Sequence, residues 1–228
     1  MATNNHPQRR GLKAAGVALG LTLAARMLLT RSQQEADLHG QVAIITGGSR
    51  GLGLAISREL ARQGCRLAIC ARNELELARA RTDLEQHGAE VLAVPCDVSN
   101  RDQVAMMVDL VTSRYGNIDI LVNNAGIIVV APAEAVTHED LERVMATNFW
   151  GTVHPTLAVL PGMRARGAGR IVNITSIGGK IAVPHMLPYT CAKFGAVGFS
   201  SGLRAELLNT GVMVTTVVPG LMRTGSYL

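Results

Sequence analysis

The sequence predicts a doubly wound α/β fold with a central parallel sheet, and two observations support this prediction. Between residues 42 and 218, short runs of Val, Ile, Leu and Ala alternate with longer segments that carry a helical pattern of apolar residues. Strands and helices that alternate in this way need a parallel sheet with right-handed crossovers. The chain also has 228 residues, of which 48% are hydrophobic and 17% charged, so it is long enough to bury one sizeable core.

The first predicted strand, Val42–Thr46, leads directly into a glycine-rich turn and then into a helix. Its apolar run is typical of a parallel strand that is buried on both faces. Glycines allow backbone N–H groups to approach a pyrophosphate at the N-terminus of the helix, where the helix dipole favours an anion. A tight turn without a ligand is the alternative. The candidate dinucleotide-binding residues in this stretch are Thr46, Gly47, Ser49, Arg50, Gly51, Leu52 and Gly53.

The other strands are predicted from apolar, β-branched runs, and the other helices from apolar residues spaced three and four apart. Gly64 and Gly88 follow two of the predicted helices, as C-terminal glycines often do. Pro155 and Pro161 predict breaks in the long helical segment His138–Arg166. Strands are predicted at Arg66–Ala71, Glu90–Pro95, Ile118–Val122, Arg170–Ile174 and Val212–Val218, and further helices at Leu54–Gln63, Asn73–Gln86, Asp102–Tyr115 and Tyr189–Asn209.

The composition argues against nucleic-acid binding and against a metal site. The formal net charge is +5, but the basic residues are dispersed and only 3% of residues are aromatic. Such a balance also suits a phosphorylated cofactor. The six histidines form no HxxxH or HExxH pair, and the four cysteines have no zinc-type spacing, so no metal site is predicted. Buried, reduced thiols are predicted at Cys65, Cys70, Cys96 and Cys191.

Residues 1–37 are predicted to form an extension before the main domain, which spans residues 38–228. Gly11–Thr30 is rich in Ala, Leu and Gly, but Lys13 and Arg26 leave only twelve uncharged residues between them. A membrane-spanning helix needs about 20. Two interpretations stay open: a helix that packs on protein or lies in solvent, and a segment that attaches to a membrane surface through its apolar residues and its cations.

The residues that follow the second strand bear on the choice of cofactor. An acidic side chain at this position selects NAD(H) by bonding the ribose 2′-hydroxyl, whereas an arginine accommodates the 2′-phosphate of NADP(H). The sequence places Arg72 there, and Arg50 adds a second guanidinium group in the glycine-rich turn. The sequence therefore favours NADP(H) over NAD(H). The alternative is that both arginines are solvated charges at helix ends.

Tyr189 and Lys193 stand four residues apart in a predicted helix, so they share one face. A tyrosine that exchanges a proton near neutral pH needs a pKa about 3 units below its usual value near 10. A cation about 4 Å away, at an effective dielectric constant of about 20, supplies stabilisation of that size. We therefore predict that Lys193 lowers the pKa of Tyr189. Ser176, at a strand end, is predicted to donate a hydrogen bond to a substrate oxygen, with a strand-end cap as the alternative.

These motifs together resemble those of the short-chain dehydrogenase/reductase family, over Leu38–Thr224. The resemblance rests on the TGxxxGxG turn at Thr46–Gly53, on the run Asn123-Asn124-Ala125-Gly126, and on the YxxxK pair Tyr189 and Lys193 with Ser176 upstream. It implies a Rossmann-like sheet with strand order 3-2-1-4-5-6. It also implies hydride transfer between NADP(H) and a carbonyl or secondary alcohol, with Tyr189 as the general acid and base.

The resemblance also implies roles for individual residues. Lys193 would hold the nicotinamide ribose, and Asn148 would support a water-borne proton relay to Lys193, with a structural kink in the helix as the alternative for Asn148. The cofactor contacts that the family pattern implies are Asp97, Val98, Asn124, Ala125, Gly126, Tyr189, Lys193, Pro219, Gly220 and Thr224.

The pattern departs from the family at its C-terminal end. Members of the family usually continue for several dozen residues past the Pro-Gly segment, through a substrate-binding loop and helix and a seventh strand, whereas this sequence ends at Leu228. We therefore expect a fragment or a truncated reading frame, with a genuine short form as the alternative, and an apolar sheet edge at strand six. A catalytically incomplete NADP(H)-binding protein without a substrate lid is the alternative to an enzyme.

The resemblance further implies a homodimer or homotetramer with Thr152–Arg164 and Tyr189–Asn209 at the interface. It implies a cytoplasmic protein, for which attachment to the cytoplasmic face of a membrane through residues 11–30 is an open alternative. Lys180–Leu187 is mostly apolar and is predicted to border the substrate pocket. This segment favours an apolar ketone or alcohol as substrate.

Overall fold

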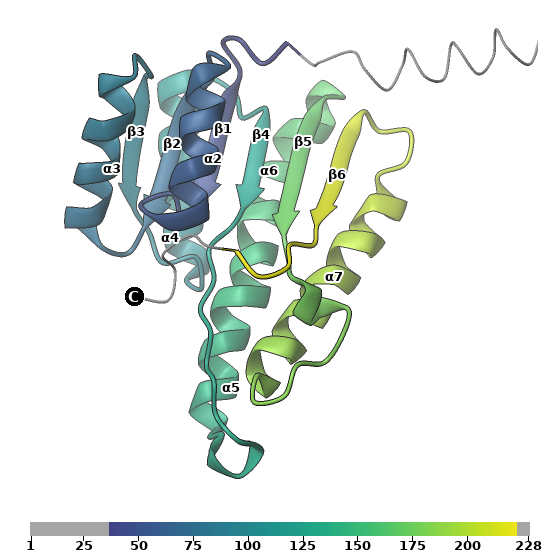
Figure 1. Ribbon diagram of the computed structural model, residues 1–228. Helices are drawn as coiled ribbons and strands as arrows, with labels where there is room; N and C mark the ends of the chain where they lie inside the picture. The colour runs from purple at the N-terminus through teal and green to yellow at the C-terminus, as the bar shows by residue number, and fades with distance from the viewer. Residues whose placement is uncertain (1–36, 223–228) are drawn as a thin grey trace, which may run out of the picture. The chain divides into compact units, whose positions relative to one another are not determined.

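The computed structural model describes residues 37–222 and contains a six-stranded parallel sheet in the order β3-β2-β1-β4-β5-β6 (Figure 1). Each neighbouring pair of strands is parallel. The predicted fold class and strand order are therefore confirmed. The strands are β1 (Val42–Thr46), β2 (Arg66–Ala71), β3 (Val91–Pro95), β4 (Ile120–Asn123), β5 (Gly169–Ile174) and β6 (Val212–Val217).

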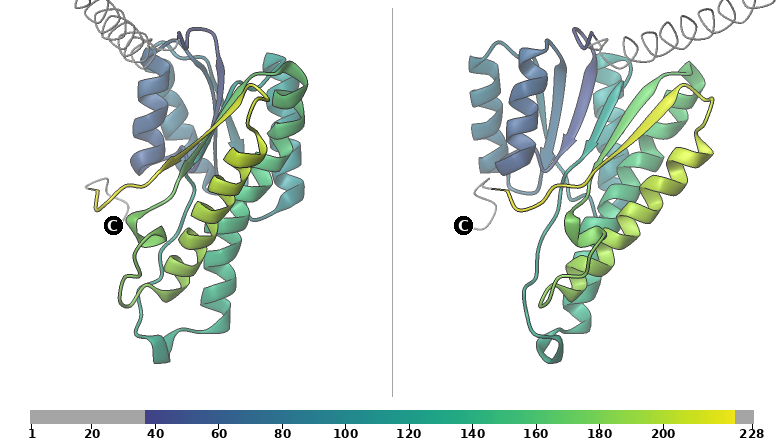
Figure 2. Two further views of the ribbon diagram at one scale, coloured as in Figure 1. Left: turned by 90° about the vertical axis from the view of Figure 1, so that its right-hand side faces the viewer. Right: turned by 45° about the vertical axis from the view of Figure 1, so that its right-hand side comes forward.

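Helices cover both faces of the sheet, and Figure 2 shows them on either side when the sheet is turned. On one face, α2 (Gly51–Arg62) and α3 (Glu74–Gln86) pack against a cluster that includes Ala43 and Ile45. On the other face, α4 (Arg101–Tyr115), α6 (Gly151–Arg166) and the end of α7 (Leu187–Glu206) pack against a cluster that includes Val42 and Ile44. Successive residues of a strand point to opposite faces, so an apolar run such as β1 serves both cores.

The long helical segment divides at a different place from the one predicted. The structure has α5 (His138–Met145), then the five-residue π-helical turn Ala146–Trp150, and then α6, which continues unbroken through its two prolines. The predicted breaks near Pro155 and Pro161 are therefore wrong. Proline fixes a φ angle that a helix can use, and the burial of one face of α6 against the sheet outweighs the backbone hydrogen bonds that the prolines cannot donate.

Two predictions concern residues outside the described range: residues 1–36 of the predicted extension 1–37, including the candidate membrane-attachment segment 11–30, and the candidate cofactor residue Thr224. Across residues 37–222, none of the helices combines the length and the apolar character that crossing a bilayer requires. Two 3₁₀ turns complete the elements, at Ala133–Ala135 and Ile177–Gly179.

Candidate active site

The glycine-rich turn after β1 adopts a backbone that only glycine takes readily. Gly47 has a φ of +65° and Gly51 a φ of +56°, both in the left-handed region. Helix α2 starts at Gly51, three residues earlier than predicted, and its first turn has neither a capping side chain nor an acidic residue. The N–H groups at this helix start therefore keep their capacity to bind an anion, and the helix dipole favours one.

The side chains of Thr46 and Asn124 hold this turn in place. The fully buried Thr46 hydroxyl oxygen accepts hydrogen bonds from the backbone N–H of Asn124 at 2.9 Å and of Ala125 at 3.1 Å. The Asn124 amide in turn donates to the carbonyl oxygens of Thr46 at 3.0 Å and Gly47 at 3.3 Å. A side chain at Gly53 would collide with the Gly47 carbonyl oxygen and lie 2.6 Å from the Asn124 amide nitrogen. The segment after β4 therefore supports the turn after β1.

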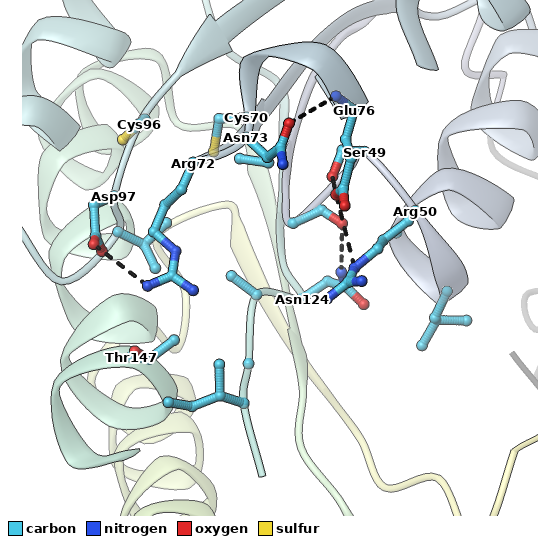
Figure 3. A pocket seen from close by; sticks show the side chains of 18 residues that line it. Ser49, Arg50, Cys70, Arg72, Asn73, Glu76, Cys96, Asp97, Asn124 and Thr147 are labelled. Carbon is cyan, nitrogen blue, oxygen red and sulfur yellow. Dashed lines mark hydrogen bonds and ion pairs between the residues drawn. The ribbon is translucent and has the colours of Figure 1, made fainter. Parts of the chain in front are cut away.

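A cavity of about 550 Å³ opens beside the turn, at the carboxyl ends of β1, β2, β3 and β4 (Figure 3). Ligands of open α/β sheets bind at this edge. The uncapped helix start, the close-approach glycines and the size of the cavity fit a dinucleotide. The predicted residues that line it are Gly47, Ser49, Arg50, Leu52, Gly53, Arg72, Asp97, Val98, Asn124, Ala125 and Gly126. Thr46 and Gly51 do not line it, because Thr46 lies beneath the turn and Gly51 starts the helix.

Seven further residues line this cavity, none of which the sequence predicts as a cofactor contact: Cys70, Ala71, Asn73, Glu76, Cys96, Ile127 and Thr147. Three of them, namely Glu76, Cys70 and Cys96, carry a charge or a thiol. Glu76 faces Ser49 and Arg50, and Cys96 follows β3 beside Cys70 of β2. A strand-end position is the only sequence signal that marks the two cysteines, and Glu76 has none beyond its place in the first turn of a helix.

Both predicted arginines at the cavity already face a carboxylate. Arg50 Nε lies 3.8 Å from Glu76 Oε2, and Arg72 Nη1 lies 3.9 Å from Asp97 Oδ2. The two arginine side chains are 64% and 65% exposed, so each can turn toward an incoming phosphate. Exposed pairs at such distances contribute little to stability.

A second cavity of about 180 Å³ brings the predicted catalytic residues together. Ser176, Tyr189 and Lys193 line it with Pro219 and Gly220, as the sequence predicts. The two cavities adjoin one another, because three residues line both of them: Leu52, Asn124 and Gly126. Ile177 N donates to the Pro219 carbonyl oxygen at 2.9 Å, which fixes the segment after β6 beside Ser176.

Ser176 and Tyr189 flank Gly178 in this second cavity. A Cβ atom on Gly178 would lie 3.2 Å from Tyr189 Cε1 and 3.5 Å from Ser176 Oγ. The absence of a side chain at Gly178 therefore lets the side chains of Ser176 and Tyr189 lie close to this turn. Ser176 Oγ also accepts a hydrogen bond from the N–H of Gly178 at 3.1 Å. The serine therefore caps the 3₁₀ turn after β5 and keeps its own O–H for donation to another acceptor.

Lys193 is buried in the wall of this cavity. Its side-chain nitrogen donates to the carbonyl oxygen of Ile174 at 3.0 Å and lies 5.7 Å from the centre of the Tyr189 ring. Burial lowers the pKa of Lys193 to about 8, because a low-dielectric environment disfavours the charged form. The predicted neighbourhood of tyrosine and lysine, one helical turn apart, is present.

Asn148 sits in the π-helical turn between α5 and α6 and is fully buried. Its side-chain oxygen accepts from the N–H of Ile127 at 2.8 Å, and its side-chain nitrogen donates to the Ile127 carbonyl oxygen at 2.8 Å. A Cβ atom on Gly126 would lie 3.3 Å from Asn148 Oδ1 and 3.8 Å from Lys193 Nζ. Asn148 thus anchors the backbone at Gly126 and Ile127, which lies between the side chains of Asn148 and Lys193.

Behind the cavities, a buried chain of polar side chains links the sheet to α6 and α7. Asn123 Nδ2 donates to Thr156 Oγ1 and to Asn173 Oδ1, both at 2.8 Å. Asn173 Nδ2 then donates to Ser200 Oγ at 2.9 Å, and Ser200 Oγ lies 2.6 Å from Thr216 Oγ1. This network was not predicted from the sequence, although an asparagine inside the apolar run of β5 is an available signal.

The prediction of four buried thiols is only partly correct. Cys65, Cys70 and Cys96 are buried and free, but Cys191 is exposed. Cys191 lies on α7 between Tyr189 and Lys193. Since residues two apart in a helix point in different directions, Cys191 is not on the helix face that carries those two residues. A hydrogen bond with Cys96, together with burial, raises the pKa of Cys70.

Comparisons with known proteins agree with this geometry. A sequence profile of short chain dehydrogenases matches residues 41–227. A Streptomyces coelicolor protein named as a candidate ketoacyl reductase is 41% identical over 195 residues, which are 83% of this chain and 73% of that protein.

Solved structures agree as well. A variant of the actinorhodin polyketide ketoreductase, crystallised with NADPH, matches with a TM-score of 0.80 and 40% identity, over 82% of this chain and 72% of that one. A short chain dehydrogenase/reductase from Burkholderia phymatum, in complex with NAD, matches with a TM-score of 0.81 and 32% identity, over 83% of this chain and 69% of that one. The chain therefore belongs to the short-chain dehydrogenase family, and it is an oxidoreductase that uses a nicotinamide cofactor on a carbonyl or alcohol group.

Proposed function

We propose that this protein transfers a hydride between NADP(H) and a carbonyl or secondary alcohol, with Tyr189 as the general acid and base. The observation that carries the proposal is the convergence of Ser176, Tyr189 and Lys193 on one cavity, which adjoins the cavity at the glycine-rich turn. The similar ketoreductase crystallised with NADPH supports the reaction class and the cofactor.

Each catalytic side chain has a separate task in this mechanism. The nicotinamide group, when bound, supplies or accepts the hydride. The Ser176 O–H donates to the substrate oxygen as negative charge develops on it. Tyr189 gives its phenolic proton to that oxygen during reduction and takes the proton back during alcohol oxidation. The Lys193 ammonium group favours the ionised phenol.

Asn148 and the backbone at Ile127 act as positioning groups. Because both polar atoms of the Asn148 side chain bond to Ile127, they fix the chain next to Lys193. We propose the water-borne relay to Lys193 as a further role of the Asn148 backbone and side chain. Pro219 and Gly220 contact the nicotinamide end of the cofactor in this proposal, since they line the cavity with Tyr189.

The proposed substrate is an apolar ketone or alcohol. Val183 and Met186, which belong to the apolar segment singled out in the sequence, line the cavity beside Tyr189. Ile128, Leu221 and Met222 add further apolar surface. Pockets with mostly apolar walls and a few placed polar groups orient a substrate through the polar groups and bind it through the walls.

The substitution Tyr189→Phe tests the mechanism. It removes the proton-transferring oxygen and leaves the ring, so turnover of NADPH with a panel of apolar ketones should fall by about 10²- to 10⁴-fold. Reduced nicotinamide is followed by its ultraviolet absorbance. Tyr115→Phe is the matched control and should keep the wild-type rate, because Tyr115 is a buried tyrosine on α4 whose ring faces Arg66 and Arg114 and lines neither cavity.

Three outcomes distinguish an enzyme with Tyr189 as acid and base from the alternatives. Loss of turnover in Tyr189→Phe alone supports the proposal. Equal rates in Tyr189→Phe and wild type contradict the role of the tyrosine. Tight binding of NADPH by the wild type without turnover of any ketone or alcohol favours the alternative, a cofactor-binding protein that lacks the substrate lid.

A further inference from the structure

We propose that Glu76 sets the cofactor selectivity of this protein by occupying, before the cofactor binds, the position next to Ser49 and Arg50 that the 2′-phosphate of NADP(H) would take. The carboxylate then competes with that phosphate. It therefore holds the preference for NADP(H) over NAD(H) below the level that two arginines alone would give. The inference rests on the proposed function, because it needs a nicotinamide cofactor in the larger cavity.

The contacts of Glu76 are those of an anion in a phosphate site. Ser49 Oγ donates a hydrogen bond to Glu76 Oε2 at 3.2 Å, and Arg50 Nε lies 3.8 Å from the same oxygen. A hydroxyl and a guanidinium group are common donors to a phosphate. Figure 3 shows Ser49, Arg50 and Glu76 together at one wall of the cavity.

The start of α3 places Glu76 at this wall of the cavity. Glu76 lies in the first turn of α3, and its N–H donates to the Asn73 side-chain oxygen at 3.0 Å, which caps the helix. Asn73 also lines the cavity. The side chain of Glu76 is 34% exposed, so it has room to swing into solvent when a phosphate arrives.

The carboxylate of Asp97, which also lines the cavity, is less free to move when a phosphate binds. Asp97 Oδ1 accepts from both the N–H and the Oγ of Ser99, at 2.9 and 2.7 Å, which ties the Asp97 carboxylate to its own turn. In Glu76, Oε2 makes both contacts described above, and within residues 37–222 no neighbouring turn ties the carboxylate in the same way. Glu76 is therefore the carboxylate whose charge a 2′-phosphate meets at Ser49 and Arg50.

Removing this charge should favour the cofactor that carries the extra phosphate. In Glu76→Gln, Ser49 and Arg50 no longer face a carboxylate, so the Kd for NADP⁺ should fall by about tenfold, the scale of one removed charge at a few ångströms near a surface. NAD⁺ has no 2′-phosphate, and its Kd should change by less than about twofold. The readout is the ratio of the two Kd values, which a general loss of structure would not move in this direction.

Calorimetric titration of the full chain with NADP⁺ and NAD⁺ tests the inference. Glu74→Gln is the matched control, because Glu74 lies in the same first turn of α3 and complements the same helix dipole but does not line the cavity. Glu76→Asp keeps the charge and should keep the wild-type ratio to within about threefold. We expect the ratio to shift toward NADP⁺ in Glu76→Gln alone.

The failures of the two proposals differ. If the wild type binds NADP⁺ or NAD⁺ and Glu76→Gln leaves the ratio of their Kd values unchanged, or shifts it as Glu74→Gln does, the inference about Glu76 is overturned and the proposed function stands. If the wild type binds neither nucleotide, the proposed function is contradicted, and the inference falls with it.

Discussion

Lys193 is a buried ammonium group that the folded protein keeps at a cost. It is only 5% exposed, and its side-chain nitrogen donates a hydrogen bond to the Ile174 carbonyl oxygen. Its pKa is lowered from 10.5 to about 8 by burial. Below about pH 8 the lysine is charged in both the folded and the unfolded state, so the folded state carries the full cost of burying the charge. Between about pH 8 and pH 10.5 only the unfolded state holds the proton, and stability therefore rises with pH.

This sign gives a prediction for Lys193→Met, which replaces the ammonium group by an apolar chain of similar length. The free energy of unfolding of the wild type should gain up to about 3 kcal/mol relative to Lys193→Met between about pH 7 and pH 10. Denaturant titrations of both proteins across this range measure the difference. Lys180→Met, at an exposed lysine, is the control and should show a flat difference. A flat difference for Lys193→Met would contradict the burial of a charged lysine.

For individual residues, the sequence predicts which side chains lie close together when those residues are near one another along the chain. Tyr189 and Lys193 are one helical turn apart, and the glycines of the turn are contiguous, so their proximity follows from helix and turn geometry alone. Glu76 lies 27 residues from Ser49, and the two meet only because α2 and α3 pack on the same face of the sheet. No spacing rule within one element predicts such a contact.

The connection between α5 and α6 is the element that holds the chain at Ile127 in place. The π-helical turn Ala146–Trp150 places the Asn148 side chain inward, and π-helical turns are frequent at functional sites. The side chain then satisfies both backbone groups of Ile127. Helical periodicity predicts the helices on either side, but it carries no signal for the one extra residue in this turn.

We therefore predict that Asn148→Ala destabilises the protein as well as impairing turnover. The N–H and C=O of Ile127 would lose their partners in a partly buried place, which should lower the free energy of unfolding by about 1–3 kcal/mol. Asn117→Ala, whose side chain bonds to Asp119 at the opposite edge of the sheet, should cost less. Denaturant unfolding measures both. Unchanged stability in Asn148→Ala would leave only the proton relay as its role.

The prolines of α6 show why element boundaries were harder to predict than element types. Pro155 is buried in the face of α6 that packs toward the sheet. A rule about proline in helices concerns local hydrogen bonds, whereas the continuity of α6 is decided by packing against β4 and β5. The order of strands, in contrast, was predicted in full, because the resemblance to the family implies the arrangement of the whole sheet.

On the scale of the whole molecule, two apolar surfaces are candidates for contact between copies. The family resemblance predicts an interface on α6 and α7, where Leu157 is 53% exposed and Phe194 45% exposed. The outer strand β6 carries Met213, which is 55% exposed, on the described sheet. The two surfaces belong to different elements, so substitutions can separate them.

If copies associate through α6 and α7 as predicted, Leu157→Arg should shift the protein toward the monomer by placing a charge in that interface. Sedimentation velocity over a range of concentrations measures the change in association, which should exceed tenfold in the dimer Kd. Met213→Lys, on β6, should associate like the wild type. The reverse result, loss of association in Met213→Lys only, would move the interface to the sheet edge.

The bonds that Thr46 and Asn124 make around the glycine-rich turn have a kinetic consequence. Since the side chains of Thr46 and Asn124 already hold the glycine-rich turn, the entropy cost of ordering this turn arises when the chain folds and not when the nucleotide binds. Capture should then proceed as an encounter with a rigid, preorganised receptor, at a speed governed by diffusion and by the field of the arginines rather than by a rearrangement of the loop.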